Sequence, residues 1–249
     1  MRIFLTVLLS SVILSGCGSI PPSVTADAAS KPSSASTALA PIVQQENPTS
    51  QPSEAVLVPE PVSPPAPQPL LRDFVRVRDH LPGIFQDLKY ATADNFTGQT
   101  IYGFSDAYLR YGTLLKLARA QAMLSEENYR LLIWDAFRPV QAQFRLWEVC
   151  PDPVYVANPE KGFSSHSRGN TVDVTLVTAD GKPVEMPTGF DDFSPLADRD
   201  YRDVSPSAAA NAQLLEEVMS ACGFKPYSGE WWHFSDTDQY PVEEFFLPE

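Results

Sequence analysis

The stretch Ser164-Ser165-His166-Ser167-Arg168-Gly169-Asn170-Thr171-Val172-Asp173 decides the fold of this 249-residue chain. Its second half opens an apolar strand, which we predict over residues 171–177. Apolar residues alternate there with Asp173 and Thr175, so these two side chains share one face of the strand. The stretch therefore places a histidine and an aspartate next to the start of a core strand.

Sequence patterns on both sides of this stretch predict further elements of an α+β domain. A helical stripe of apolar residues covers Thr113–Ser125, and a compact apolar run, typical of a buried strand, covers Tyr129–Asp135. Pro139 is well placed to begin a helix that reaches Val149. A long irregular stretch, Pro183–Asp203, follows the central strand, and such loops are often functional.

The C-terminal part predicts one more helix and a hairpin. The helix covers Ser207–Ala221, with Ser207 as a candidate N-cap and Gly223 ending it. Phe224–Tyr227 and Glu230–Phe234 are predicted to form the two strands of the hairpin. The second of these strands begins with Glu230-Trp231-Trp232-His233, which places another histidine three residues after a glutamate.

His166, Asp173 and His233 form a candidate three-ligand metal set. Two imidazoles and one carboxylate suit Zn²⁺ and leave a fourth position for water. A histidine is nevertheless more often structural than a ligand, and the sequence contains no HExxH helix. Spacing alone therefore leaves the structural interpretation open.

Glu230 and His233 present a problem of strand geometry. Residues three apart on a regular strand point to opposite faces. Both side chains reach one metal ion only if the strand is bulged, strongly twisted or ends at this point.

Arg138 follows the apolar strand directly, in Trp134-Asp135-Ala136-Phe137-Arg138-Pro139. The end of a strand is where a sheet presents side chains to a site, and Pro139 favours an extended conformation for Arg138. The alternative interpretation is a surface arginine that pairs with a neighbouring carboxylate. Trp231 and Trp232 are predicted to be core and pocket wall.

Four segments together resemble the zinc D-Ala-D-Ala peptidases of the VanX/VanY type, and more closely the VanX-like D-alanyl-D-alanine dipeptidases of family M15. They occur in order over most of residues 75–248. The segments are Tyr90-Ala-Thr-Ala-Asp-Asn-Phe-Thr-Gly98, Leu132-Ile-Trp-Asp-Ala-Phe-Arg-Pro139, Ser164-Ser-His-Ser-Arg-Gly169 through Asp173-Val-Thr-Leu176, and Glu230-Trp-Trp-His233.

The resemblance implies a compact α+β domain with a central antiparallel sheet flanked by helices. It also implies that His166, Asp173 and His233 bind one Zn²⁺ per chain. Glu230 would be the general base that takes a proton from water and passes it to the leaving amine. Arg138 would bind the developing oxyanion.

The resemblance further implies two substrate-binding residues. Ser164 occupies the first motif position and would line the pocket, and Asp191 would lie near the ammonium group of a free dipeptide. Thr171 departs from the family, which usually has alanine there, so the shape of the pocket near Asp173 is less well defined by the resemblance.

The sequence is compatible with three functions. The leading hypothesis is a zinc dipeptidase that splits D-Ala-D-Ala into two D-alanines. The alternative is a D,D-carboxypeptidase or endopeptidase that acts on peptidoglycan stem peptides with the same metal chemistry. The third is an inactive envelope-anchored binding protein, which the presence of Glu230, Arg138 and all three ligands argues against.

The N-terminus predicts export and lipidation. A basic start is followed by an apolar run, Ile3–Leu14, which has signal-peptide length, and then by Leu14-Ser15-Gly16-Cys17, which resembles a lipobox. Residues 1–17 would be a lipoprotein signal peptide with Cys17 carrying the lipid; the alternative is an ordinary secretory signal with an incidental cysteine. The expected location is the cell envelope, and, in a Gram-negative host, the periplasmic face of the outer membrane.

Residues 18–70 are predicted to form a disordered linker. Residues 1–70 hold twelve of the 24 prolines, and no aromatic residue lies between Phe4 and Phe74, so little is available to build a core. The alternative is a Pro-rich ligand for a partner domain. The dipeptidase domain would then cover residues 71–249.

Charge and cysteine content limit the partners. The net charge is −13, and residues 1–70 contribute −2, so the domain carries −11 and is a poor match for nucleic acid. Cys150 and Cys222 remain besides Cys17; they form either a disulfide or two buried free thiols. No oligomeric state follows from the sequence.

Overall fold

The computed structural model describes residues 67–153, 155–243 and 245, which all lie within one unit of the chain. The predicted signal peptide, Cys17 and the linker as far as residue 66 lie outside the described residues. Within the described part of the chain, no helix is long and apolar enough to cross a membrane.

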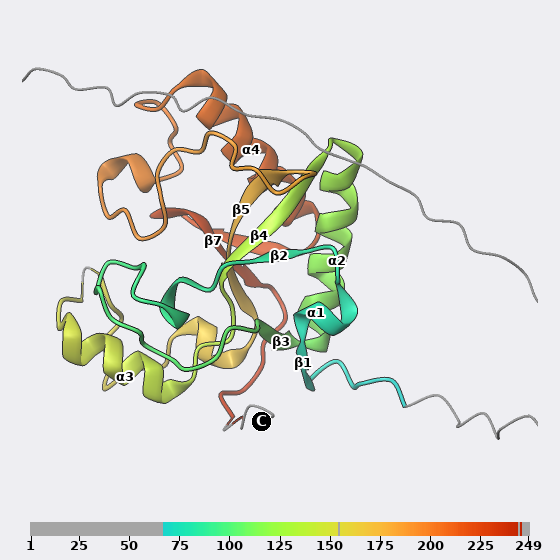
Figure 1. The fold of residues 1–249 in the computed structure, drawn as a ribbon. Helices are drawn as coiled ribbons and strands as arrows, with labels where there is room; N and C mark the ends of the chain where they lie inside the picture. The colour runs from blue at the N-terminus through green and yellow to red at the C-terminus, as the bar shows by residue number, and fades with distance from the viewer. Residues whose placement is uncertain (1–66, 154, 244, 246–249) are drawn as a thin grey trace, which may run out of the picture. The chain divides into compact units, whose positions relative to one another are not determined.

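A five-stranded sheet forms the centre of the domain (Figure 1). Its strand order is β2-β4-β5-β7-β6, with β2 at Phe85–Gln86, β4 at Tyr129–Asp135, β5 at Thr171–Thr178, β7 at Glu230–Asp236 and β6 at Phe224–Tyr227. A second, two-stranded sheet pairs β1 (Phe74–Arg76) with β3 (Tyr108–Arg110). The predicted α+β class is confirmed.

The central sheet is mixed, so the expectation of an antiparallel sheet was wrong at one edge. β2 runs parallel to β4, whereas β4, β5, β7 and β6 are antiparallel to their neighbours. Parallel pairing requires a crossover connection, and the long segment between Gln86 and Tyr129, which includes a helix, supplies it.

Four α-helices accompany the sheets in the described residues: α1 at Val77–His80, α2 at Tyr111–Glu126, α3 at Val140–Val149 and α4 at Pro206–Ala221. Three short 3-10 helices lie between them, η1 at Lys89–Ala91, η2 at Ser165–Arg168 and η3 at Pro195–Ala197. Figure 1 shows α2 and α4 beside the strands and α3 apart from both.

Two predicted helix starts shift by one position or more. Ser205 rather than Ser207 is the N-cap of α4, because its Oγ accepts a hydrogen bond from the Ala208 amide at 3.1 Å and Pro206 fits the first turn. Pro139 is the N-cap residue of α3 and not its first helical residue.

The hydrophobic core lies between the sheet and helices α2 and α4. Leu131 and Ile133 of β4 and Val172 and Val174 of β5 are fully buried. Leucines of α2 and α4 belong to the same buried cluster. Every residue of β5 from Thr171 to Val177 is buried, so the face that carries Asp173 is covered as well.

A bulge in β7 resolves the geometric problem of Glu230 and His233. Pro226 of β6 pairs with Phe234, but the next residue, Tyr227, pairs with Glu230. The residues between them on β7 therefore have no partner in β6, and the strand does not keep its regular alternation. As a result, His233 Nδ1 lies 3.6 Å from Glu230 Oε2.

Cys150 and Cys222 are both free thiols. Cys222 is buried, and its Sγ contacts Met123 Sδ at 3.6 Å, whereas Cys150 is partly exposed at the end of α3. Of the two interpretations left open by the sequence, the structure supports free thiols, although Cys150 is not fully buried.

Candidate active site

Three neighbouring strands bring acidic and imidazole side chains to one level of the sheet. Asp173 of β5 is paired with Asp135 of β4 on one side and with His233 of β7 on the other. The β4–β5 register is irregular between Ile133 and Asp135, so Asp135 lies at the distorted end of its strand. The sheet thus aligns Asp135, Asp173 and His233 in one row.

His166 reaches this row from η2. Ser164 is the N-cap of η2, and its Oγ accepts a hydrogen bond from the His166 amide at 3.3 Å. Gly169 ends the helix with φ of +73°, and a Cβ atom there would lie 2.2 Å from the Phe74 ring. The turn that presents His166 therefore requires glycine at its end.

The tautomer of His166 is set by the backbone. Its Nδ1 lies 2.8 Å from the Ala136 carbonyl oxygen, which can only accept a hydrogen bond, so Nδ1 carries the proton. Nε2 is then left with a lone pair that points towards Asp173 and His233. An outer hydrogen bond of this kind is the usual support of a metal-binding imidazole.

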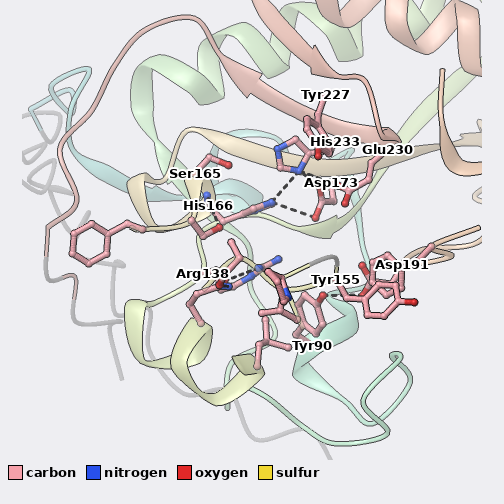
Figure 2. Close-up of a pocket in the computed structure, with 18 residues that line it drawn as sticks. Tyr90, Arg138, Tyr155, Ser165, His166, Asp173, Asp191, Tyr227, Glu230 and His233 are labelled. Carbon is pink, nitrogen blue, oxygen red and sulfur yellow. Dashed lines mark hydrogen bonds and ion pairs between the residues drawn. The ribbon is translucent and has the colours of Figure 1, made fainter. Parts of the chain in front are cut away.

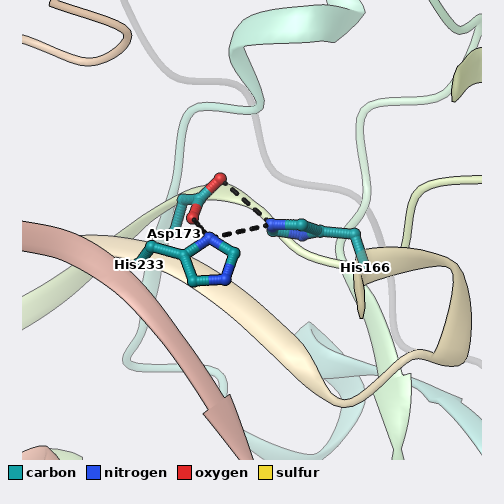
Figure 3. A group of neighbouring side chains, drawn as sticks. All are labelled: His166, Asp173 and His233. Atoms are coloured by element: carbon teal, nitrogen blue, oxygen red, sulfur yellow. Dashed lines mark hydrogen bonds and ion pairs between the residues drawn. The ribbon is translucent and has the colours of Figure 1, made fainter. Parts of the chain in front are cut away.

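The ligand atoms of His166, Asp173 and His233 converge (Figure 3). His166 Nε2 lies 3.3 Å from Asp173 Oδ2 and 3.4 Å from His233 Nδ1, and His233 Nδ1 lies 3.0 Å from Asp173 Oδ1. Ligands bound tetrahedrally at about 2.0–2.1 Å would be about 3.3–3.4 Å apart. The 3.0 Å contact of His233 Nδ1 with the buried Asp173 Oδ1 lacks hydrogen-bond geometry, so this oxygen has no hydrogen-bond partner among the described residues. The donor set therefore fits a bound metal ion.

The electrostatics of the three residues favour a positive charge between them. Burial alone would raise the pKa of Asp173, but His166 and His233 hold that pKa below its usual range. Burial would likewise lower the pKa of His166, and the carboxylates of Asp173 and Asp135 raise it instead. A cation, either a proton on an imidazole or a metal ion, is what this cluster stabilises.

Arg138 is buried and held by Asp135. Its Nε and Nη2 donate to Asp135 Oδ2 at 3.0 and 2.6 Å, and its Nη1 donates to Gln143 Oε1 at 2.9 Å. Burial would lower the pKa of Arg138, but Asp135 raises it above its usual value, so the guanidinium stays charged. The interpretation as a surface arginine was wrong, although the partner carboxylate exists. Arg138 also lines the cavity described below.

Asp135 is a site residue that the sequence did not reveal. Its Oδ1 accepts hydrogen bonds from the Tyr102 hydroxyl at 2.7 Å and the Ala136 amide at 2.9 Å, while its Oδ2 binds Arg138 and lies 3.5 Å from His166 Nδ1. One fully buried carboxylate thus orients both Arg138 and His166. The only local signal was its position three residues before Arg138.

Glu230 lies beside the metal set. It is partly buried, and burial together with the nearby carboxylate of Asp173 raises its pKa, while His233 acts in the opposite direction. A carboxylate with a raised pKa next to a metal set is suited to accept and return a proton.

Asp191 lies at another part of the same pocket. It adopts φ of +54°, and its Oδ2 accepts a hydrogen bond from the Tyr90 hydroxyl at 2.8 Å. Burial raises the pKa of Asp191 to about 8, and the hydrogen bond from Tyr90 opposes that rise. The Phe190 ring packs on Tyr90 with ring centroids 5.6 Å apart, which fixes the loop that carries Asp191.

One cavity of about 360 Å³ is lined by the candidate metal ligands and by the other charged side chains that face them, which are Arg138, His166, Asp173, Asp191, Glu230 and His233 (Figure 2). Ser164 is part of its wall, as are Ser165, Tyr155 and Tyr227. The volume falls in the range of about 300–1,000 Å³ that is typical of small-molecule pockets. Nothing in the sequence indicated that Tyr90, Tyr155 and Tyr227 line a wall, because they come from three separate places, the 3-10 helix η1, a turn and the end of β6.

Thr171 does not reach this cavity. Its hydroxyl forms a hydrogen bond of 2.9 Å with the hydroxyl of Ser235, which is its pairing partner across the strands. The departure at Thr171 is therefore matched by Ser235 and leaves the arrangement around Asp173 intact.

A metal set, an adjacent carboxylate base and a charged arginine in one small cavity are the components of a hydrolytic metal site. Arg138 offers donors for an oxygen that gains negative charge, and Glu230 offers a proton acceptor. Asp191 adds a carboxylate that forms no ion pair with any described residue.

Comparisons with known proteins point to one family of peptidases. The family model described as D-Ala-D-Ala dipeptidase, Peptidase M15, matches residues 71–247. A protein of Escherichia coli K12 called D-alanyl-D-alanine dipeptidase is 40% identical over 163 residues, which cover 65% of this chain and 84% of the relative. Proteins with the same name from Streptomyces coelicolor and Enterococcus faecalis are 36% and 35% identical, and each comparison covers 70% of this chain and 96% of the relative.

The family match spans the whole region that holds the candidate site, from Tyr90 to His233. The resemblance inferred from the four sequence segments is confirmed. The chain therefore belongs to the peptidase M15 family of D-Ala-D-Ala dipeptidases and is a metallo-dipeptidase.

Proposed function

We propose that the protein hydrolyses the free dipeptide D-Ala-D-Ala to two D-alanines, with one Zn²⁺ held by His166, Asp173 and His233. The observation that carries this proposal is the position of Asp191 in the same small cavity as the metal set. A free dipeptide has an ammonium group, and a half-buried carboxylate without an ion-pair partner among the described residues is a suitable partner for it. The names of the relatives support the choice of substrate.

Each residue of the site has a distinct task in this reaction. Zn²⁺, when bound, supplies Lewis acidity and activates water as the nucleophile. Glu230 accepts a proton from the attacking water and transfers it to the amine that leaves. Arg138 donates hydrogen bonds to the carbonyl oxygen of the scissile bond as negative charge develops on it.

Asp191 and Tyr90 orient the substrate in this proposal. Asp191 pairs with the substrate ammonium, which favours its ionised form and lowers the pKa that burial raises. Tyr90 donates to Asp191 Oδ2 and so holds the carboxylate in place. Ser164 contributes to the wall next to His166.

The test compares two substrates on one preparation. Release of D-alanine is measured from D-Ala-D-Ala and from N-acetyl-D-Ala-D-Ala, which mimics a stem peptide because its amino end carries no charge. We expect kcat/KM to be far higher for the free dipeptide. Equal or faster cleavage of the acylated substrate would contradict the proposal and favour the carboxypeptidase or endopeptidase alternative.

Replacing Asp191 by asparagine should raise KM for the free dipeptide and reduce the preference over the acylated one. A hydrogen bond to a charged group contributes about 1.5–3 kcal/mol, which corresponds to roughly a 10- to 150-fold loss in kcat/KM. The matched control is Asp192→Asn, since Asp192 accepts a hydrogen bond from the Ser194 amide and does not line the cavity. An unchanged substrate preference in Asp191→Asn would exclude the assigned role.

We also propose that the protein is anchored in the cell envelope through Cys17 and recovers D-alanine released during turnover of the cell wall. An exported dipeptidase has no access to the cytoplasmic pool of precursors, which argues against a role in depleting that pool. Replacing Cys17 by alanine should move the protein from the membrane fraction to the soluble fraction on cell fractionation. An identical distribution of the variant and the wild type would contradict lipid anchoring.

A further inference from the structure

The bulge in β7 leaves backbone groups that the sheet does not pair. β6 and β7 are in register from Phe224 to Pro226, and pairing then jumps to Tyr227 and Glu230. The carbonyl groups of Tyr227 and His233 lie at this irregularity. Carbonyl groups that lose their partners where a ladder is interrupted can accept hydrogen bonds from side chains instead.

Arg199 supplies those donors. Its Nε donates to the Tyr227 carbonyl at 2.7 Å, and its Nη2 donates to the His233 carbonyl at 3.0 Å. The Arg199 amide also donates to the Ser228 carbonyl at 3.3 Å. One side chain therefore joins the two strands on either side of the bulge.

The guanidinium of Arg199 is itself held rigidly. Its side chain is only 8% exposed, and Nη1 donates to Glu216 Oε2 of α4 at 3.0 Å. The Tyr201 hydroxyl donates to the same oxygen at 2.8 Å, and the guanidinium lies over the Phe234 ring at 4.5 Å. Lysine offers a single ammonium group and cannot reproduce this planar set of donors.

We propose that Arg199 is a positioning residue of the metallo-dipeptidase, which fixes the bulge so that His233 and Glu230 face the same cavity. The bulge is what places His233 Nδ1 within 3.6 Å of Glu230 Oε2, whereas regular pairing of β7 with β5 places it 3.0 Å from Asp173 Oδ1. Arg199 touches none of the reacting groups and acts through the His233 backbone. The kinetic part of this inference rests on the proposed function, and the metal-binding part does not.

Arg199 also connects the two halves of the site. Arg199 belongs to the same irregular stretch, Pro183–Asp203, as Asp191. It also forms hydrogen bonds with both strands of the β6–β7 hairpin, which carries Glu230 and His233. The Arg199 side chain thus connects the loop that carries Asp191 to β7, the strand that carries His233.

The experiment measures Zn²⁺ affinity of Arg199→Met and Arg199→Lys by competition with a chelating dye, next to kcat and KM for D-Ala-D-Ala. We expect both variants to lose about 10- to 100-fold in Zn²⁺ affinity, as is typical when the outer support of a metal ligand is removed. In zinc-saturated protein, kcat should fall while KM changes little, because Arg138 and Asp191 keep the hydrogen bonds with Asp135 and Tyr90 that hold them in place. The visible spectrum of the Co²⁺-loaded variants should differ from that of the wild type.

Two further variants, Arg199→Ala and Glu216→Gln, test whether the guanidinium group itself supports Zn²⁺ binding. Arg199→Ala should regain Zn²⁺ affinity on addition of guanidinium ion, whereas Glu216→Gln, which loosens the guanidinium but leaves it present, should show a smaller loss of the same kind. The control is Arg119→Met, since Arg119 donates to the Cys222 carbonyl at 3.1 Å outside the site and should affect thermal stability alone. If Arg199→Met does not fold, the positioning role of Arg199 is tested by the Zn²⁺ affinity of Glu216→Gln and by the recovery of Zn²⁺ affinity in Arg199→Ala with guanidinium ion.

Wild-type Zn²⁺ affinity in Arg199→Lys and Glu216→Gln, with only thermal stability reduced, would overturn the inference. A wild-type protein that does not cleave D-Ala-D-Ala would overturn the proposed function instead. Loss of metal affinity in the Arg199 variants would then still support the positioning role.

Discussion

Replacing Glu230 by glutamine is expected to lower kcat for D-Ala-D-Ala by about 10²- to 10⁴-fold, the range that a positioned proton-transfer group contributes. Glutamine has almost the same shape but cannot accept the proton of the attacking water. It also leaves His166, Asp173 and His233 in place, so bound metal and KM should change little.

The activity should also depend on pH, because it requires the ionised form of Glu230. Burial and the Asp173 carboxylate raise the pKa of Glu230, and only its ionised form is a base. Activity of the wild type should therefore be lost as the pH falls through that raised pKa and recovered above it. Glu230→Gln should lack this acidic limb in a plot of kcat/KM against pH.

The matched control for Glu230→Gln is Glu185→Gln, because Glu185 is exposed, bonds Ser205 and lies outside the cavity. The Glu185→Gln variant should retain the wild-type kcat and KM. Turnover by Glu230→Gln within a few fold of the wild type would rule out Glu230 as the base and require another proton acceptor.

Replacing His166 by alanine is expected to have the second large effect, because it removes a metal ligand. Metal chemistry contributes several kcal/mol to the stabilisation of the transition state, so activity should fall by about 10³-fold or more. The substitution also removes the imidazole that offsets the charge of the buried Asp173, which should reduce stability of the metal-free protein.

Thermal unfolding with and without Zn²⁺ separates these two effects. A ligand that binds only the folded state stabilises it by an amount that grows with the logarithm of the ligand concentration divided by Kd, so Zn²⁺ should raise the unfolding temperature of the wild type and not that of His166→Ala. The control is His80→Ala, since His80, the third histidine of the chain, lies in α1 and packs on Tyr111 of α2, away from the site. Zinc-dependent stabilisation that survives in His166→Ala would place the metal elsewhere.

The regular elements could be predicted because each has a local pattern. The apolar run Tyr129–Asp135 was predicted with the bounds that β4 has. The helix α2 begins two residues before its predicted start and ends one residue after its predicted end, and α4 begins one residue early. By contrast, β1, β2 and β3 contain only two or three residues each, which is too short for any period to appear. Tertiary pairing alone makes them strands.

The candidate site was predicted only in part, for a related reason. His166, Asp173 and His233 occur in recognisable motifs, so the resemblance could assign them. Asp135 acquires its role from contacts with Tyr102 and His166, which are distant in sequence. The bulge in β7 violates the alternation of a regular strand, and its support, Arg199, comes from a loop without any pattern.

The central claim is that a metal ion bound by His166, Asp173 and His233 drives cleavage of D-Ala-D-Ala. Its most direct test is a titration of metal-free protein with Zn²⁺, in which D-alanine release and bound zinc are measured together. We expect no activity before zinc is added and a linear rise that ends at one zinc per chain, with no such rise in His166→Ala. Full D-alanine release by the metal-free protein, or a zinc-dependent rise that persists in His166→Ala, would contradict it.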